Sequence, residues 1–295
     1  MTARFGEVMV AMVTPFDDDL ALDLDAARDL ARWLVEQGAD GLVLAGTTGE
    51  APTLTDEEKL DLFRAVREAV DVPLLAGTGS FDTAHTIELT RAAAHTGVEG
   101  FLVVSPYYSK PSQAGIEAHF RAVGEASDLP FLIYDVPGRT GRRIDTDVVL
   151  RLAHEVPTLA GIKDATGDPG ASARLVAESP SSFELYSGDD ALTLPLLAVG
   201  AVGVVGVATH WSAAEHAQMI SAFTKGDVDE ARRVNALLLE SYDFEVSPES
   251  PHAVSAKAML RALGVRVGQC RPPIGPTPDG LEARARDVHD RLKAG

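Results

Sequence analysis

The sequence predicts an α/β fold: a (β/α)₈ TIM barrel over residues 1–224, followed by a C-terminal helical extension over residues 225–295. Three observations indicate this fold class. Short runs rich in Val, Leu and Ile alternate eight times with longer amphipathic segments, as in a barrel of strand–helix units. The short runs are apolar throughout, which is typical of parallel strands covered on both faces. No Gly-x-Gly-x-x-Gly motif follows the first run, as it would in an open dinucleotide-binding sheet.

The expected elements follow one another along the chain as strand, then helix. Strands are expected at residues 8–14, 41–45, 73–76, 100–105, 130–135, 159–164, 183–187 and 202–208. Helices are expected at 23–37, 56–70, 83–94, 115–126, 146–154 and 168–178, and near the C-terminus at 214–225, 228–242, 254–263 and 280–293. Thr55 and Glu58 fit a capping box at the start of the second helix, and Gly38 and Gly97 fall near helix ends.

The composition excludes several classes of function. The chain has 26 basic and 44 acidic residues, and its formal net charge of −18 argues against binding to a nucleic-acid backbone. No apolar run approaches the roughly 20 residues that a membrane-spanning helix requires, and the N-terminal run indicates a strand rather than a signal peptide. Cys270 is the only cysteine, which excludes an intrachain disulfide and a thiolate zinc cluster. We therefore expect a cytoplasmic protein that binds neither nucleic acid nor membrane.

One lysine, Lys163, lies within a run that otherwise has the composition of a buried strand, Leu159-Ala160-Gly161-Ile162-Lys163-Asp164. An apolar interior penalises the lysine cation, so burial favours the neutral amine. The neutral amine is the form that attacks a carbonyl carbon. Lys163 is therefore a candidate nucleophile, and the alternative is that it ends an edge strand and points into water.

Polar residues at the carboxyl ends of barrel strands share one active-site face. Here those ends have Gly46-Thr47-Thr48-Gly49-Glu50, Gly77-Thr78-Gly79, Tyr107-Tyr108, Tyr134 with Arg139, Lys163, and Ser187-Gly188-Asp189-Asp190. Tyrosines can transfer protons, arginine can hold a carboxylate and lysine can form a Schiff base with a ketone; together these are the parts of a class I aldolase. The tyrosines could instead be core aromatics, and Arg139, Arg142 and Arg143 a solvated basic turn. No metal-binding histidine motif, P-loop or Gly-x-Ser-x-Gly elbow is found.

Five segments occur in the order and approximate spacing of a known superfamily. They are Gly46-Thr47-Thr48-Gly49-Glu50, Ser105-Pro106-Tyr107-Tyr108, Tyr134-Asp135-Val136-Pro137, Gly161-Ile162-Lys163-Asp164 and Ser187-Gly188-Asp189-Asp190. On these motifs the chain resembles, over nearly its whole length, the dihydrodipicolinate synthase and N-acetylneuraminate lyase superfamily of pyruvate-dependent barrels. Gly46-Thr47-Thr48 and Arg139 resemble the dihydrodipicolinate synthase branch, and the Tyr-Asp-x-Pro-Gly-Arg variant resembles its actinobacterial members. The resemblance implies condensation of pyruvate with L-aspartate 4-semialdehyde in lysine and diaminopimelate biosynthesis.

The resemblance also implies a set of catalytic residues. Lys163 is expected to form the imine with pyruvate, and Tyr134 to relay protons during imine formation and carbon–carbon bond formation. Thr47 and Tyr108 are expected to complete this relay. The resemblance implies neither a metal ion nor an organic cofactor.

A second set of residues is expected to bind the substrates. Thr48 and its amide are expected to bind the pyruvate carboxylate, and Arg139 the carboxylate of the aldehyde substrate. Gly188 and Val205 are expected to line the pocket through backbone groups. Because family members are commonly tetramers, the resemblance implies a homotetramer, a dimer of dimers, with Tyr107 at the subunit contact.

Three departures from the family pattern affect these expectations. The C-terminal Asn-Pro-x-Pro-x-Lys motif is replaced by His252-Ala253-Val254-Ser255-Ala256-Lys257, which concerns the packing of the extension. Strand eight runs into Thr209-His210-Trp211, which is bulky enough to reshape the second-substrate pocket. The positions of the lysine feedback site in inhibited relatives are Asp56, Lys59, Phe81 and His85, and on them we predict weak or absent inhibition by lysine.

Two other functions remain open on the sequence alone. One is another pyruvate-dependent class I aldolase, either a 2-keto-3-deoxy sugar acid aldolase or an N-acetylneuraminate lyase, and Arg139 is the residue that discriminates against it. The other is a non-catalytic barrel that binds a keto acid. Reductive trapping of pyruvate on Lys163 discriminates against that reading.

Overall fold

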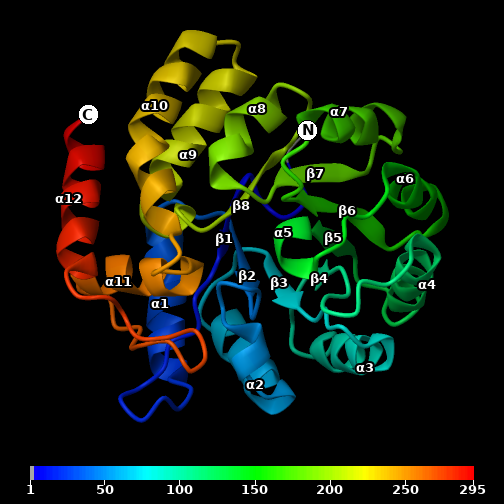
Figure 1. The fold of residues 1–295 in the computed structure, drawn as a ribbon, viewed down its shortest axis with the longest axis horizontal. Coiled ribbons are helices and arrows are strands. Elements are labelled where there is room, and N and C mark those ends of the chain that lie inside the picture. Colours follow the sequence, from blue (N-terminus) through cyan, green and yellow to red (C-terminus); the bar gives the residue numbers. More distant parts are fainter. Residues whose placement is uncertain (1–2) are drawn as a thin grey trace.

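The computed structural model describes residues 3–295 and contains a closed barrel of eight parallel strands (Figure 1). The strands are β1 (Val8–Ala11), β2 (Gly41–Leu44), β3 (Leu74–Gly77), β4 (Gly100–Val104), β5 (Phe131–Asp135), β6 (Leu159–Asp164), β7 (Glu184–Ser187) and β8 (Gly203–Gly206). Each strand pairs with the next one along the chain, and β8 pairs with β1 to close the barrel. The predicted (β/α)₈ barrel is therefore confirmed.

Every predicted strand is present, but several are shorter than their apolar runs. The run 8–14 gives a strand that ends at Ala11, and the run 202–208 gives a strand that ends at Gly206. Val13 and Val207 are still buried beyond these ends. Apolar composition therefore marks burial, while the backbone leaves the sheet earlier and forms the loops at the strand ends.

Eight helices cover the outside of the barrel. They are α1 (Leu24–Glu36), α2 (Asp56–Arg67), α3 (Thr83–Ala93), α4 (Gln113–Gly124), α6 (Thr146–Glu155), α7 (Pro169–Glu178), α8 (Thr193–Leu197) and α9 (Thr209–Thr224). The predicted capping box of α2 is confirmed, because the Glu58 amide donates to the Thr55 hydroxyl (3.1 Å) and the Thr55 amide donates to the Glu58 carboxylate (2.9 Å). Gly38 and Gly97 have positive φ beyond the ends of α1 and α3.

Short elements in the loops after the strands were not expected from the sequence. They are η1 (Ala51–Thr53), α5 (Pro137–Thr140), η2 (Asp190–Leu192) and α8. In addition, α9 begins at Thr209, whereas the sequence predicted a start at residue 214. The helical pattern is interrupted there by Ser212, which has non-helical backbone angles and donates its hydroxyl to the carbonyl of Ala208 (2.7 Å).

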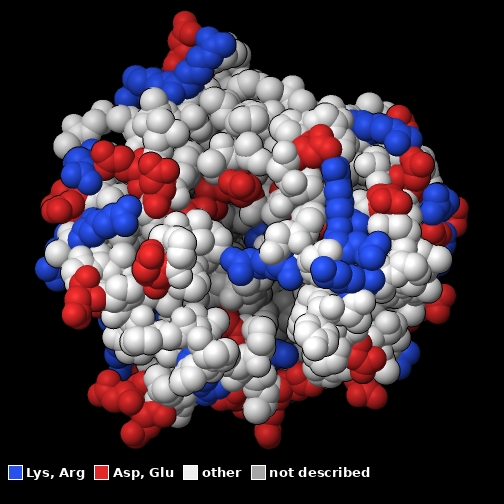
Figure 2. All heavy atoms as spheres, viewed as in Figure 1, with Lys and Arg blue, Asp and Glu red and all other residues white. Residues whose placement is uncertain are grey.

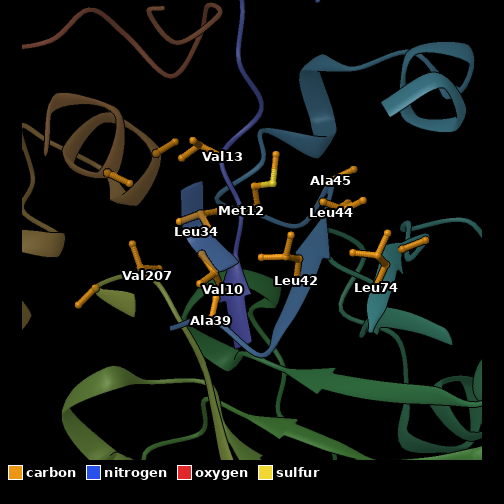
Figure 3. Packing of buried hydrophobic residues seen from close by; sticks show 14 of the residues in the cluster. Val10, Met12, Val13, Leu34, Ala39, Leu42, Leu44, Ala45, Leu74 and Val207 are labelled. Atoms are coloured by element: carbon orange, nitrogen blue, oxygen red, sulfur yellow. The ribbon is translucent and has the colours of Figure 1, made fainter. Parts of the chain in front are cut away.

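Two layers of apolar side chains make up the core. Met9, Val43 and Leu132 belong to the layer that fills the barrel interior. Leu42, next to Val43 on β2, belongs to the layer between the barrel and its helices, which also includes Leu34 of α1 (Figure 3). Successive residues belong to different layers because side chains alternate between the two faces of a strand. The barrel interior is therefore packed, which leaves the strand ends as the place for a ligand.

The C-terminal extension consists of α10 (Val228–Glu245), α11 (His252–Ala262) and α12 (Leu281–Ala294), which lie beside α9 along one side of the barrel (Figure 1). Trp211 of α9 donates its indole N–H to Ser241 of α10 (3.0 Å) and packs edge-on against Phe244 (5.9 Å between ring centres). These contacts hold the end of α10 close to the end of β8. The division into residues 1–224 and 225–295 falls in the turn before α10 and stays a prediction. Every helix within residues 3–295 is too short or too polar to span a bilayer.

Candidate active site

Lys163 lies on a strand that has neighbours on both sides, since its Cα pairs with Tyr134 of β5 and Tyr186 of β7. The alternative of an edge strand that points into water is therefore wrong. The side chain is only 5% exposed, and its Nζ lies 4.4 Å from the centre of the Tyr134 ring. Burial lowers the pKa of Lys163 from 10.5 to about 8, although the Asp190 charge opposes this change. A far larger share of this amine is therefore neutral at pH 7 than in an exposed lysine.

Lys163 lines a cavity at the strand ends, which we call the lysine cavity. Its wall includes five other residues of the predicted site: Thr47, Thr48, Tyr134, Arg139 and Gly188. Basic side chains lie beside a hollow near the middle of the face shown in Figure 2. Residues that follow β2, β5 and β7 therefore meet at the lysine of β6. Among residues 3–295, no group of three or more His, Cys, Asp or Glu side chains is arranged to hold a metal ion.

Tyr134 lies beside Lys163 in the wall of the lysine cavity. The side chain is 7% exposed, and burial raises its pKa above the usual 10. The positive charge of Arg139 and the nearby Thr47 side chain oppose this rise. The phenol therefore keeps its proton at neutral pH, and the Thr47 side chain gives it a partner for proton exchange.

A second cavity adjoins the first, and we call it the tyrosine cavity. The two cavities share Gly46, Thr47, Tyr134 and Arg139. Tyr107 lines the tyrosine cavity, where its ring packs edge-on against that of Phe81 (5.6 Å between centres). The two cavities therefore lie next to each other and together form a cleft at the strand ends.

Gly188 brings the backbone after β7 directly against the lysine. Its amide donates to the carbonyl of Asp164 (2.7 Å), and a Cβ at this position would lie 3.0 Å from Cγ of Lys163. A side chain here would press equally on Ala165 and Lys163, and these neighbours would have to move by a few tenths of an ångström. Gly188 lines the lysine cavity, and the role expected for its backbone groups stays a prediction.

These features match one known family of enzymes. The model of the Dihydrodipicolinate synthetase family matches residues 4–293. The chain belongs to this family. The resemblance inferred from five short motifs is therefore confirmed over almost the whole chain.

Named members of the dihydrodipicolinate synthetase family are similar over their full length. A 4-hydroxy-tetrahydrodipicolinate synthase of Acidothermus cellulolyticus is 49% identical over 287 residues, 97% of this chain and 92% of the relative. One of Corynebacterium aurimucosum is 49% identical over 99% of this chain and 95% of the relative. The crystal structure of a dihydrodipicolinate synthase from Bacillus anthracis has a TM-score of 0.92 and 40% identity, covering 98% of this chain and 99% of that chain.

The two adjacent tyrosines lie in places opposite to those that the family resemblance led us to expect. Tyr108 is 91% exposed and lines neither cavity, whereas Tyr107 lies in the wall of the tyrosine cavity. The backbone at Tyr108 is left-handed, with φ of +71°, so the chain turns sharply between the two side chains. Within a single chain, Tyr108 therefore does not complete a relay with Tyr134 and Thr47.

Two other expectations concerned β8 and the residues after it. Val205 is fully buried in the barrel interior, and Val207, two residues further along, lines the lysine cavity instead. A role for the Val205 backbone stays a prediction. Thr209, His210 and Trp211 line neither cavity, so an effect on the pocket could act only through their neighbours and stays a prediction. They are buried in the first turn of α9, where His210 Nε2 accepts the Val13 amide (3.1 Å).

The extension contributes side chains that sequence reasoning missed. The lysine cavity is also lined by Tyr242, Asp243, Glu245, Val246 and His252. Burial and the nearby Arg139 charge lower the pKa of His252 to about 4, so its ring is neutral at pH 7. The helical periodicity of this region indicated packing only. The sole signal was His252, which stands at the start of the altered C-terminal motif.

Proposed function

We propose that this chain is a 4-hydroxy-tetrahydrodipicolinate synthase, a lyase that condenses pyruvate with L-aspartate 4-semialdehyde through a Schiff base on Lys163. The proposal rests on one observation above all. The Lys163 amine, whose pKa is about 8, lies in one cavity with Tyr134 and Arg139 and forms no ion pair within the described part of the chain. Relatives that are 45–49% identical bear this enzyme name, which supports the proposal.

The first half of the reaction joins pyruvate to the lysine. The neutral Nζ of Lys163 attacks the ketone carbon of pyruvate, and the carbinolamine loses water to give a cationic imine. Tyr134 donates the proton that the departing hydroxyl needs and exchanges protons with Thr47. The imine then draws electrons from the pyruvate methyl group, which loses a proton to the Tyr134 phenolate and becomes the nucleophilic carbon of an enamine; Tyr134 thereby regains the proton that it gave to the hydroxyl.

The second half forms the new carbon–carbon bond. The enamine carbon attacks the aldehyde carbon of the semialdehyde, and the resulting alkoxide takes a proton from Tyr134. The amino group of the bound product then attacks the imine carbon. This step closes the ring and releases the Lys163 amine, so the enzyme returns to its starting state.

Each substrate brings one carboxylate that needs a partner. Thr48 lines the lysine cavity and is 4% exposed, which supports a role for its hydroxyl and amide in holding the pyruvate carboxylate. Arg139 borders both cavities and can hold the carboxylate of the semialdehyde in a two-pronged hydrogen bond. The two carboxylates are thereby separated along the cleft, which orients the aldehyde carbon toward the enamine.

We further propose that the enzyme is a cytoplasmic homotetramer, a dimer of dimers, in which one subunit supplies Tyr108 to the site of its neighbour. Tyr108 and Phe81 are 91% and 60% exposed, and large exposed aromatic side chains are typical of surfaces that bind another protein. Tyr108 in this arrangement takes the contact role that the sequence had assigned to Tyr107. It also rejoins the proton relay, from the neighbouring chain.

Weak or absent inhibition by lysine stays part of the proposal. Asp56 is already paired within the chain, with Lys59 at 3.2 Å and with the His85 ring at 2.6 Å. A free lysine would have to compete with both partners for this carboxylate. One relative of 40% identity, from Cyanidioschyzon merolae, was solved with lysine bound, so the family does include members that bind it. Half-maximal inhibition at micromolar lysine would contradict the proposal.

The deciding experiment compares aldehydes in one assay with purified enzyme and pyruvate. We expect kcat/KM for L-aspartate 4-semialdehyde to exceed that for N-acetylmannosamine and for glyceraldehyde by a few orders of magnitude. Preference for a sugar aldehyde would move the chain to the aldolase branch. Failure of borohydride to trap pyruvate on Lys163 would favour a non-catalytic keto-acid-binding barrel.

Two arginine variants sharpen this comparison. Arg139→Ala is expected to lower kcat/KM for the semialdehyde by roughly two orders of magnitude, as for a lost bidentate carboxylate contact, and to leave pyruvate trapping intact. Arg142→Ala is the matched control, since it removes a cation three residues away that lines neither cavity. Unchanged turnover of the semialdehyde by Arg139→Ala would remove the main support for the synthase assignment.

A further inference from the structure

Two carboxyl groups from distant parts of the chain lie side by side in the wall of the lysine cavity. Asp190 begins η2 and Glu245 ends α10, and the two residues are 1% and 6% exposed. The amide of Val207 donates to Oδ2 of Asp190 (2.8 Å), and the next amide, of Ala208, donates to Oε2 of Glu245 (3.1 Å). Consecutive backbone amides after β8 therefore hold both carboxyl groups in fixed, adjacent positions.

The second oxygen of Asp190, Oδ1, has no hydrogen-bond donor among residues 3–295, although it is buried. Its surroundings are closed, since a Cβ on Gly206 would lie 2.3 Å from it and Nε2 of His216 is 3.7 Å away. A buried carboxylate oxygen without a donor is costly. A proton on Glu245 would supply the missing donor.

Protonation of one member of the pair also follows from electrostatics. Two buried carboxyl groups in close contact do not both ionise at neutral pH. Burial, and after it the charge of Asp190, raise the pKa of Glu245 well above its usual range.

We propose that Asp190 and Glu245 share one proton and act as a single negative charge that governs how readily the Lys163 amine loses its own proton. The inference rests on the proposed function, in which this amine forms the imine. Both carboxyl groups raise the pKa of Lys163, opposing the larger effect of burial. Asp190 and Glu245 are positioning residues, because they act through Lys163 and not on the substrate.

Several other titratable groups face the pair. They are Lys163, Arg139, Asp189, His210, His216, Tyr242 and His252. Burial lowers the pKa of His210 and of His252 to about 4, so both rings are neutral at pH 7. Burial raises the pKa of Tyr242, which therefore keeps its proton. Apart from the His216 ring, whose Nε2 lies 3.7 Å from Asp190, the charged groups around the pair are Lys163, Arg139 and Asp189.

Amide substitutions distinguish a shared proton from two independent charges. In Glu245→Gln the amide replaces the protonated acid and leaves −1 on Asp190. In Asp190→Asn the Asp190 charge that helps to raise the pKa of Glu245 is gone, and the new amide can donate a hydrogen bond to Glu245, which then carries the charge. Each single variant is therefore expected to keep the wild-type pH dependence of pyruvate trapping on Lys163. The double variant has no charge at this place, and we expect the midpoint of its pH profile to fall by roughly one pH unit.

Other charge states of the pair predict different results from the same variants. If both groups were ionised, each single variant would lower the midpoint and the two effects would add. If both were neutral, none of the three variants would move it. Either pattern would overturn the proposal. Glu240→Gln is the matched control, because it removes a carboxylate from the exposed side of the same helix, where Glu240 pairs with Arg291.

A spectroscopic test does not depend on catalysis. At pH 8 the infrared spectrum of the wild type should contain the carbonyl band of a buried protonated carboxyl group. Difference spectra should show its loss in both single variants and its retention in Glu240→Gln. The pKa of Asp135 is raised to about 7, so this other buried acid is largely ionised at pH 8. Absence of any variant-dependent band would refute the shared proton.

The two measurements separate this inference from the proposed function. Suppose the infrared band is lost in the single variants but the wild type does not trap pyruvate. The shared proton would then be established, whereas the imine chemistry of Lys163, and with it any effect of the pair on catalysis, would be contradicted. Normal trapping with no infrared difference would leave the synthase proposal in place. It would exclude a shared proton on the carboxyl pair as the group that governs Lys163. A misfolded variant would be recognised by its unfolding curve, and the remaining single variant would still give the spectroscopic answer.

Discussion

Two lysines of this chain are buried in closely similar surroundings, yet the structure gives them opposite roles. Lys163 is 5% exposed with its amine 4.4 Å from the centre of the Tyr134 ring, and Lys257 is fully buried with its amine 4.2 Å from that of Phe16. The difference is the partner. Lys257 lies 2.7 Å from Glu50, which is also fully buried, and donates to the carbonyl of Gln269 (2.9 Å).

The comparison shows that burial alone does not make a lysine reactive. Burial lowers the pKa of both amines, but for Lys257 the Glu50 charge and hydrogen bond oppose this, so the pair is held as a buried ion pair. Lys163 has no carboxylate within ion-pair distance in the described residues, and its pKa falls to about 8. One lysine thus joins α11 to the loop that follows β2, and the other is free to attack a carbonyl.

The largest expected effect comes from removing the reactive amine. Lys163→Met keeps the length of the side chain and removes the nucleophile, so turnover should fall by roughly 10⁴-fold or more and pyruvate trapping should disappear. Steady-state assays and mass spectrometry after borohydride treatment measure both. The fold should remain intact, because the substitution places an apolar side chain in a buried position. Trapped pyruvate in this variant would show that another amine forms the imine.

The structural lysine should respond in the opposite way. Lys257→Met leaves the Glu50 carboxylate buried without its cation, and the free energy of unfolding is expected to fall by about 3–5 kcal/mol. Chemical denaturation measures this loss. Glu50→Gln combined with Lys257→Met removes both charges and should recover most of it. A double variant as unstable as the single one would mean that packing around Phe16, rather than the charge pair, stabilises this region.

The third effect concerns pH and arises from the lowered pKa of Lys163. Between pH 8 and 10.5 the unfolded chain binds more protons at this lysine than the folded chain, so its contribution makes stability rise with pH in that window. Below pH 8 the buried amine destabilises the fold by about 3 kcal/mol. Lys163→Met should therefore exceed the wild type in stability below pH 8, with the difference vanishing above 10.5. A difference that does not change with pH would show that this pKa is not lowered.

The sequence predicts the fold and the central residues of the site because both depend on local patterns. Apolar runs mark the strands, and strand ends bring Lys163, Tyr134 and Arg139 together once the barrel is known. Contacts between distant segments leave no such pattern. The pairing of Glu50 with Lys257 and the approach of Glu245 to Asp190 depend on how the extension docks.

The order of the two adjacent tyrosines also lies beyond pattern reasoning. Which of Tyr107 and Tyr108 faces the cavity is set by a single left-handed residue, with φ of +71° at Tyr108. A non-glycine residue rarely adopts this conformation, and the dipeptide itself does not indicate it. Sequence reasoning could therefore place the motif at the right strand end. It could not tell that, within one chain, Tyr107 faces the cavity and Tyr108 faces outward.

The smallest expected effect comes from a third lysine, which tests whether the burial of the partner matters. The Lys59 side chain is 10% exposed, but Asp56, 3.2 Å away, is 44% exposed and keeps its bond to His85 when the lysine is removed. Lys59→Met should therefore change the free energy of unfolding by less than about 1 kcal/mol. Denaturation alongside Lys257→Met gives the comparison directly. Equal losses in the two variants would mean that the loss in free energy of unfolding depends on the burial of the lysine. It would then not depend on how well water solvates the carboxylate left behind.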